Sequence, residues 1–295
     1  MSDAQALTLL FNAGVAISVG ATVASLGMTY AVPELVAPLR RVGLVVALVA
    51  MNALVIPAVA WGIAKASPMS SSYVPGLVLA TVGMGSAGAL KAAQLSKRAD
   101  MALAVSVVVV LQLVNIVAVP IWAGHIVSGA SISTWDIVRS LLAIVLAPLA
   151  VGLFIKARYK DHALEWQPQL VRVANIALVI ALATGIAANW QTIVSMFTSW
   201  VIVTAIAIIV VALGAGALLG GRSAETRTTT TLVTGVRFGS LGLIIIGTQL
   251  HGNATYLGPA ITFCLLDLLV PVALGVEIGR KVTTSPDPAT DQPPA

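Results

Sequence analysis

Residues 85–95 read GSAGALKAAQL, and residues 239–250 read GSLGLIIIGTQL. Both stretches begin with Gly-Ser-x-Gly, continue with small or apolar residues and end in Gln-Leu, although the second has one extra residue. Glycine lacks a Cβ atom and allows a helix to unwind. The pair therefore predicts an internal repeat with an interrupted helix in each copy, and the predicted hinges are Gly85, Gly88, Gly239 and Gly242.

The composition of the surrounding chain indicates a membrane protein. Of its 295 residues, 58% are hydrophobic and only 9% are charged, and the mean hydropathy is +1.00. Soluble domains carry about 25% charged residues. A bilayer accepts helices of roughly 20 apolar residues or closed barrels. Because the apolar runs here are long and do not alternate with polar residues, we expect an all-α membrane protein.

Nine membrane spans are expected, with approximate limits of 8–31, 42–64, 73–96, 101–124, 136–156, 170–189, 199–220, 228–250 and 257–278. They form one predicted transmembrane domain, residues 1–282. Residues 283–295 are polar and rich in proline, a composition that favours disorder. The sequence thus predicts a single membrane domain with a disordered tail.

Basic residues orient these spans. If the N-terminus is outside, the outer segments hold only Lys65 and Arg139 of the 16 Lys and Arg residues. The inner segments hold Arg40, Arg41, Lys97, Arg98, Lys156, Arg158, Lys160, Arg172, Arg222, Arg227, Arg280 and Lys281. Positively charged loops remain cytoplasmic, so we predict a multi-pass inner-membrane protein with an external N-terminus and a cytoplasmic C-terminus. The third and eighth spans then run in opposite directions, as inverted repeats do.

Other functional classes find little support in the sequence. The net charge of +5 comes from short loops between spans, so we do not expect nucleic-acid binding. The single cysteine, Cys264, is compatible with neither a disulfide framework nor a multi-cysteine metal site. No Walker, HExxH or GxSxG motif occurs. We therefore expect neither an enzyme nor a bound cofactor or metal.

Two cations, Lys91 and Arg237, lie inside predicted spans. An unpaired charge at the bilayer centre costs about 2.5–3.5 kcal/mol on insertion scales. Each cation has a simple structural interpretation. Lys91 is close enough to the inner end of its span to snorkel to the membrane surface. Arg237 could form a structural ion pair with Asp267. The functional interpretation is that both cations bind an anionic substrate, since a guanidinium fork bonds both oxygens of a carboxylate. Asp267 is then a partner of Arg237, a proton-coupling carboxylate, or both in turn.

Four uncharged polar residues complete the candidate site. Ser86 and Ser240 follow the first glycine of each repeat and are predicted substrate contacts. Gln112 and Asn115 lie three residues apart on one helix face, and either contact substrate or form hydrogen bonds between helices. Glycine-interrupted spans at matching places in inverted halves point to the binding site of a secondary transporter. The alternative is that glycine and serine only allow close helix packing.

Several segments resemble the bile acid:sodium symporter superfamily, which also includes bacterial anion carriers. They are SLGMTYAVPELVAPLRRVGLV at 25–45, the glycine-rich third span, KRADMALAV from Lys97, and RTTTTLVTGVRFGSLGL at 227–243. The resemblance implies a panel domain and a core domain, with substrate held where two broken helices cross. The sequence is similar to family members with nine rather than ten spans.

This resemblance also exposes a departure. It places the family's sodium ligands on residues that mostly lack side-chain oxygens: Gly88–Ala89 or Ala89–Leu90, Ala104, Val108, and Val233 or Thr234. We therefore predict a carrier for a small organic anion that works by alternating access without conventional sodium coupling. A sodium-coupled symporter and a non-transporting receptor or sensor on the same fold remain the alternatives. The expected partners are the anion and the lipid bilayer, with a proton or counter-ion left open and the oligomeric state unspecified.

Overall fold

The structure is a computed structural model that describes residues 3–29, 40–127, 142–188, 199–250 and 252–284, together with positions 135, 138, 139, 190, 191, 194 and 196. All regular secondary structure in these residues is helical. The expectation of an all-α membrane protein is confirmed. Helix α15 continues to Thr284, and the rest of the predicted tail, residues 285–295, lies outside the described residues.

Seven helical segments are long and apolar enough to cross a membrane, counted over the described residues, and one of them, Ala224–Gln249, includes a short break at residues 236–238. Two expected spans fail that length criterion for different reasons. The span expected at 73–96 is interrupted, and the span expected at 136–156 is described only in part, as η4 (Leu142–Leu146) and α9 (Ala147–Arg158). The count of nine therefore stays a prediction.

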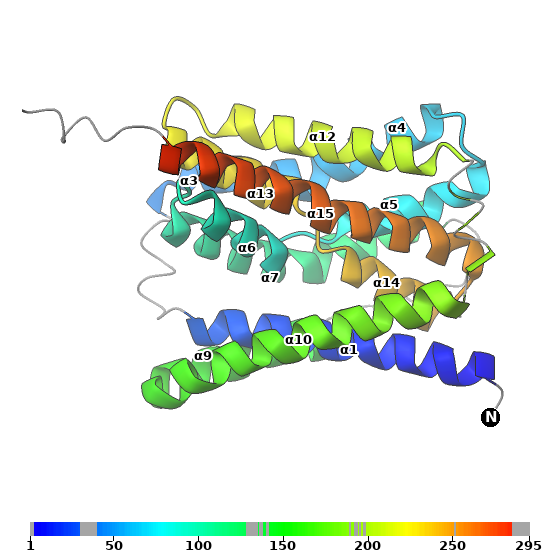
Figure 1. Cartoon of the computed structure of the whole chain (residues 1–295), viewed down its shortest axis with the longest axis horizontal. Helices are drawn as coiled ribbons and strands as arrows, with labels where there is room; N and C mark the ends of the chain where they lie inside the picture. Colours follow the sequence, from blue (N-terminus) through cyan, green and yellow to red (C-terminus); the bar gives the residue numbers. More distant parts are fainter. Residues whose placement is uncertain are drawn as a thin grey trace, which may run out of the picture.

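Three helices form a layer of their own, which lies along the bottom of Figure 1. They are α1 (Asp3–Thr29), α9 and α10 (Lys160–Ala188). Small residues allow close approach within this layer: a Cβ atom at Gly27 of α1 would lie 2.7 Å from the carbonyl oxygen of Leu149. Membrane helices associate through such contacts because lipid gives no hydrophobic drive between them.

The remaining helices form the larger part of the molecule, above this layer in Figure 1. They are α3 (Val42–Ala50), η2 (Met51–Val55), α4 (Ile56–Ala66), η3 (Ser71–Tyr73), α5 (Val74–Val82), α6 (Ala87–Ser96), α7 (Met101–Ile126), α12 (Val201–Leu219), α13 (Ala224–Gly235), α14 (Gly239–Gln249) and α15 (Ala254–Thr284). The two-part division matches the panel and core that the resemblance implies.

Two interrupted helices cross inside this larger part. The pair α5–α6 is broken at residues 83–86, and the pair α13–α14 at residues 236–238. Figure 1 shows α5 beside α14 at one end and α6 beside α13 at the other, so the two broken helices run in opposite directions. This arrangement is the one that inversion requires, although the repeat relation itself remains a prediction.

The predicted hinge glycines divide into two kinds. Gly85 lies in the first break with φ +73°, a conformation that residues with a Cβ atom rarely adopt, and Gly239 begins α14. Gly88 and Gly242 lie inside α6 and α14 and are not unwound in this structure, so their role as hinges stays a prediction. Gly242 instead permits close packing, since a Cβ atom there would lie 2.5 Å from the carbonyl oxygen of Leu79.

Candidate functional site

Side chains of α7 hold the first break open. The amide of Gln112 donates to the carbonyl oxygen of Gly85 at 2.6 Å, and the amide of Asn115 donates to that of Met84 at 2.8 Å. Asn115 also accepts from the backbone N–H of Met84 at 3.1 Å. Both side chains are fully buried and satisfy backbone groups that the missing helical turn leaves free. Of the two interpretations of Gln112 and Asn115, hydrogen bonding between segments is the one that the structure supports.

Two half-helices begin at the crossing. Ser86 is the N-cap of α6, and its hydroxyl accepts from the backbone N–H of Gly88 at 3.0 Å. Helix α14 begins at Gly239, next to Ser240. The first N–H groups of a helix have no partner within it and carry a partial positive charge. The crossing therefore presents two such helix ends to one region.

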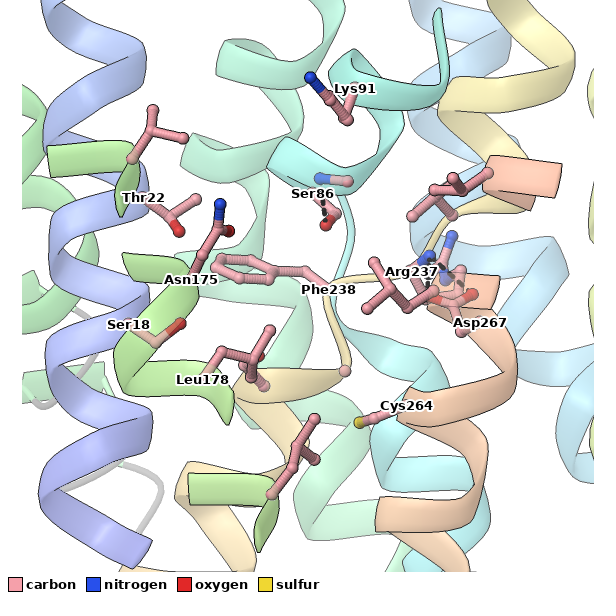
Figure 2. A pocket seen from close by; sticks show the side chains of 18 residues that line it. Ser18, Thr22, Ser86, Lys91, Asn175, Leu178, Arg237, Phe238, Cys264 and Asp267 are labelled. Carbon is pink, nitrogen blue, oxygen red and sulfur yellow. Dashed lines mark hydrogen bonds between the residues drawn. The ribbon is translucent and has the colours of Figure 1, made fainter. Parts of the chain in front are cut away.

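A cavity of about 230 Å³ lies beside these helix ends, between the crossing and the layer of α1 and α10 (Figure 2). The crossing and α15 contribute Ser86, Gly88, Lys91, Val236, Arg237, Phe238, Gly239, Ser240, Cys264, Asp267, Leu268 and Val272. The other layer contributes Ser18, Thr22, Val171, Asn175, Leu178 and Leu182. Of the predicted substrate contacts, Ser86, Ser240, Lys91 and Arg237 line this cavity.

Lys91 supplies the exposed positive charge of the cavity. It lies on α6, beyond Ser86 from the crossing (Figure 2). Its side chain is exposed, and it takes part in no ion pair or hydrogen bond within the described part of the chain. A lysine in this position is available to an anion that enters the cavity.

Arg237 is placed differently, although it also contributes to the cavity wall. Its side chain is 2% exposed, and its guanidinium makes four hydrogen bonds to protein oxygens. The acceptors are Oδ1 and the carbonyl oxygen of Asn52 and the carbonyl oxygens of Thr81 and Val82. A guanidinium has five N–H groups, so these four hydrogen bonds leave few N–H groups free to bind a carboxylate. The interpretation of Arg237 as a bidentate substrate ligand is not supported.

Asp267 contacts Arg237 through the backbone rather than through an ion pair of side chains. Both carboxylate oxygens lie 3.0 Å from the backbone nitrogen of Arg237. The side chain is 4% exposed and lines the cavity. Asp267 therefore satisfies an N–H group in the second break and also forms part of the cavity wall.

A family model independently matches much of the chain. Residues 16–208 match the model described as the Sodium Bile acid symporter family. The chain belongs to this family. The match includes the first broken helix and ends within α12, so Arg237 and Asp267 of this symporter-family protein lie beyond it. A comparison with curated proteins found no match.

Several residues that line the cavity were missed by the sequence analysis. Ser18 and Thr22 of α1 and Asn175 of α10 come from the layer opposite the crossing. Ser18 and Thr22 lie four residues apart, so they share a helix face, and all three are polar residues within apolar spans. Phe238 also lines the cavity, and its ring reaches toward Asn175 in Figure 2. Because it is an apolar residue, nothing in the sequence marked it as a cavity residue.

Proposed function

We propose that this protein is a secondary transporter for a small organic anion, located in the inner membrane with its N-terminus outside, and that it does not couple to sodium. The observation that carries the proposal is the exposed ammonium group of Lys91 in a cavity that also receives the N-terminal ends of α6 and α14. Helix N-termini and a lysine together favour negative charge.

The charges around the cavity support an anion over a cation. Asp267 is the sole acidic residue that lines it within the described part of the chain, and its carboxylate already accepts from the N–H of Arg237. Lys91 has no such partner among the described residues. An anion bound here compensates the lysine charge, which is costly to leave bare near lipid.

The size of the cavity favours a small substrate. Its volume of about 230 Å³ is below the 300–1,000 Å³ of typical ligand pockets. Apolar side chains such as Phe238 and Leu178 share the wall with the polar groups. A small carboxylate with an apolar body can contact both the polar and the apolar side chains of the wall.

The position of the cavity suggests how access alternates. One wall belongs to α1 and α10, and the other belongs to the crossing and α15. Movement of one helix group against the other, around a site at the broken helices, opens such a cavity first to one side of the membrane and then to the other.

The absence of sodium coupling is proposed from the residues at the positions where the resemblance places sodium ligands. Ala104 and Val108 of α7 are fully buried and carry no side-chain oxygen. Thr234 is buried as well, and its hydroxyl already accepts from the amide of Asn52 at 3.2 Å. These side chains offer a sodium ion few of the oxygen ligands that it requires.

Uptake by proteoliposomes tests the proposal. The reconstituted protein is given a panel of labelled small carboxylates and other organic anions, with sodium chloride inside and outside replaced by potassium or choline chloride at equal ionic strength. We expect saturable uptake of at least one anion at the same rate in all three salts. Uptake that occurs only in sodium chloride contradicts the coupling proposal, and binding without uptake favours the receptor or sensor alternative.

A further inference from the structure

The guanidinium of Arg237 occupies a socket made entirely of oxygen atoms. Nε donates to the carbonyl oxygen of Thr81 at 2.7 Å, and Nη1 donates to Oδ1 of Asn52 at 2.7 Å. Nη2 donates to the carbonyl oxygens of Asn52 and Val82, at 3.0 and 3.3 Å. Asn52, Thr81 and Val82 are fully buried. Four partly negative oxygens thus converge on one positive group away from water.

The oxygens from Asn52 are available because of a local defect in the helix. Residues Met51–Val55 form a π-helical turn, in which the N–H of Ile56 bonds to the carbonyl oxygen of Met51. The next donor in that pattern would come from Pro57, which has no N–H. The carbonyl oxygen of Asn52 is therefore left to Arg237. The side chain of Asn52 is held in place as well, since its amide donates to Leu48 and Thr234.

The other two oxygens come from the end of a half-helix. Helix α5 ends at Val82, and Gly83 follows in an extended conformation. The last carbonyl groups of a helix have no partner within it and carry a partial negative charge. The carbonyl oxygens of Thr81 and Val82 belong to this set. Unwound carbonyls and half-helix C-terminal ends are the groups with which discontinuous transporter helices bind sodium.

We propose that the Arg237 guanidinium is a built-in cation that fills a cation site between η2 and α5, and that the emptied site takes a small monovalent cation such as sodium. The positive charge is covalently attached, so the site needs no ion from solution. This inference deepens the proposed function, since it supplies a reason for sodium independence, and it rests on that part of the proposal.

Substitutions of Arg237 distinguish the effect of its positive charge from the effect of its side-chain volume. Arg237→Ala removes the charge and opens the socket. Arg237→Met removes the charge and keeps most of the side-chain length, so that the socket remains filled. Arg237→Lys keeps a positive charge within reach of the same oxygens. Because a ligand that binds only the folded protein raises Tm, the three variants predict different responses to salt.

The measurement is Tm of the detergent-purified protein in sodium, potassium and choline chloride at equal ionic strength. For Arg237→Ala we expect a Tm that rises with sodium in a saturable manner, by about 5 °C or more over choline. Wild type, Arg237→Met and Arg237→Lys should show equal Tm in sodium and choline, with Arg237→Lys above Arg237→Met. Adding Asn52→Ala to Arg237→Ala should remove the sodium response, because it deletes one of the four oxygens.

An Arg237→Ala protein that is equally unstable, or unfolded, in all three salts overturns the proposal. An Arg237→Lys protein no more stable than Arg237→Met overturns it too, because a positive charge in the socket would then contribute nothing to stability. A sodium response in the wild-type protein contradicts the sodium independence of the proposed function instead. The two failures are therefore distinguishable.

Discussion

The backbone N–H of Phe238 donates a 3.0 Å hydrogen bond to the carbonyl oxygen of Gly83, so the breaks of the two crossing helices are bonded directly to each other. The same contact depends on the missing side chain of Gly83, since a Cβ atom there would collide with the carbonyl oxygen of Phe238. The cavity that begins at Phe238 and Ser86 is built on this backbone contact.

Gly83→Ala is therefore expected to separate the two breaks. Inserting a methyl group into a well-packed contact costs about 1–3 kcal/mol, and the displaced Phe238 should also reduce anion uptake. We expect a lower Tm in detergent together with reduced uptake. Gly62→Ala in α4 is the matched control, because a Cβ atom there has no neighbour within 4 Å and alanine is the better helix former by about 1 kcal/mol. Equal Tm values for the two variants would contradict this account of the crossing.

Lys91→Gln tests the positive end of the cavity. Because the side chain is exposed, we expect anion binding to weaken by about tenfold, less than the loss of a fully buried charge pair produces. The fold should be retained, so Tm without ligand should stay near that of wild type. The measurement is the concentration dependence of uptake and of the ligand-induced rise in Tm.

Lys65→Gln serves as the control for loss of one lysine. Lys65 lies on α4 over the ring of Trp61, 4.0 Å from its centroid, and does not line the cavity. Its substitution should leave anion affinity unchanged. If Lys91→Gln behaves in the same way, the lysine snorkels to the membrane surface and does not bind the substrate.

The membrane fold and the approximate place of the site could be predicted from the sequence. Long apolar runs decide between lipid and water as solvent, and the repeated Gly-Ser-x-Gly pattern marks the two helices that are in fact broken and crossed. Arg237 and Lys91 could be selected because charges inside apolar spans are rare. Such arguments depend only on local composition, which the sequence displays directly.

The roles of individual residues depend on contacts between distant segments, which the sequence does not display. Arg237 bonds to Asn52 and to the end of α5, and the sequence around position 237 reveals neither of these partners. Those acceptors become available through Pro57 and the end of a half-helix. Gly242 likewise packs against α5, a partner that no feature near position 242 reveals. Local sequence selects unusual residues, and packing decides what they do.

The orientation in the membrane is a further prediction. The inner loops carry most of the basic residues, so the N-terminus should be outside. In intact spheroplasts, a membrane-impermeant maleimide should label Ser70→Cys, which is exposed between α4 and α5, and should not label Arg222→Cys, which is exposed between α12 and α13. The wild-type protein, with Cys264 alone, gives the background. The opposite labelling pattern would reverse the topology.

Asp267→Asn tests whether the cavity carboxylate couples anion movement to protons. Protonation of Asp267 removes a buried negative charge from a cavity that also contains Lys91, Arg237 and Cys264. Asparagine keeps one oxygen to accept from the N–H of Arg237, while the charge is fixed at zero. We expect the variant to lose accumulation driven by an inward pH gradient, down to simple equilibration, but to exchange labelled for unlabelled substrate at a rate near that of wild type.

Glu277→Gln is the matched control, because Glu277 lies on the same helix and is paired with Arg280 and Lys281. It does not line the cavity, so its loss should leave both accumulation and exchange intact. Accumulation that persists in Asp267→Asn would remove this carboxylate from coupling. Loss of accumulation and exchange together, with a lower Tm, would show instead that Asp267 serves to hold the second break at Arg237. Only the loss of accumulation alone assigns the proton to Asp267.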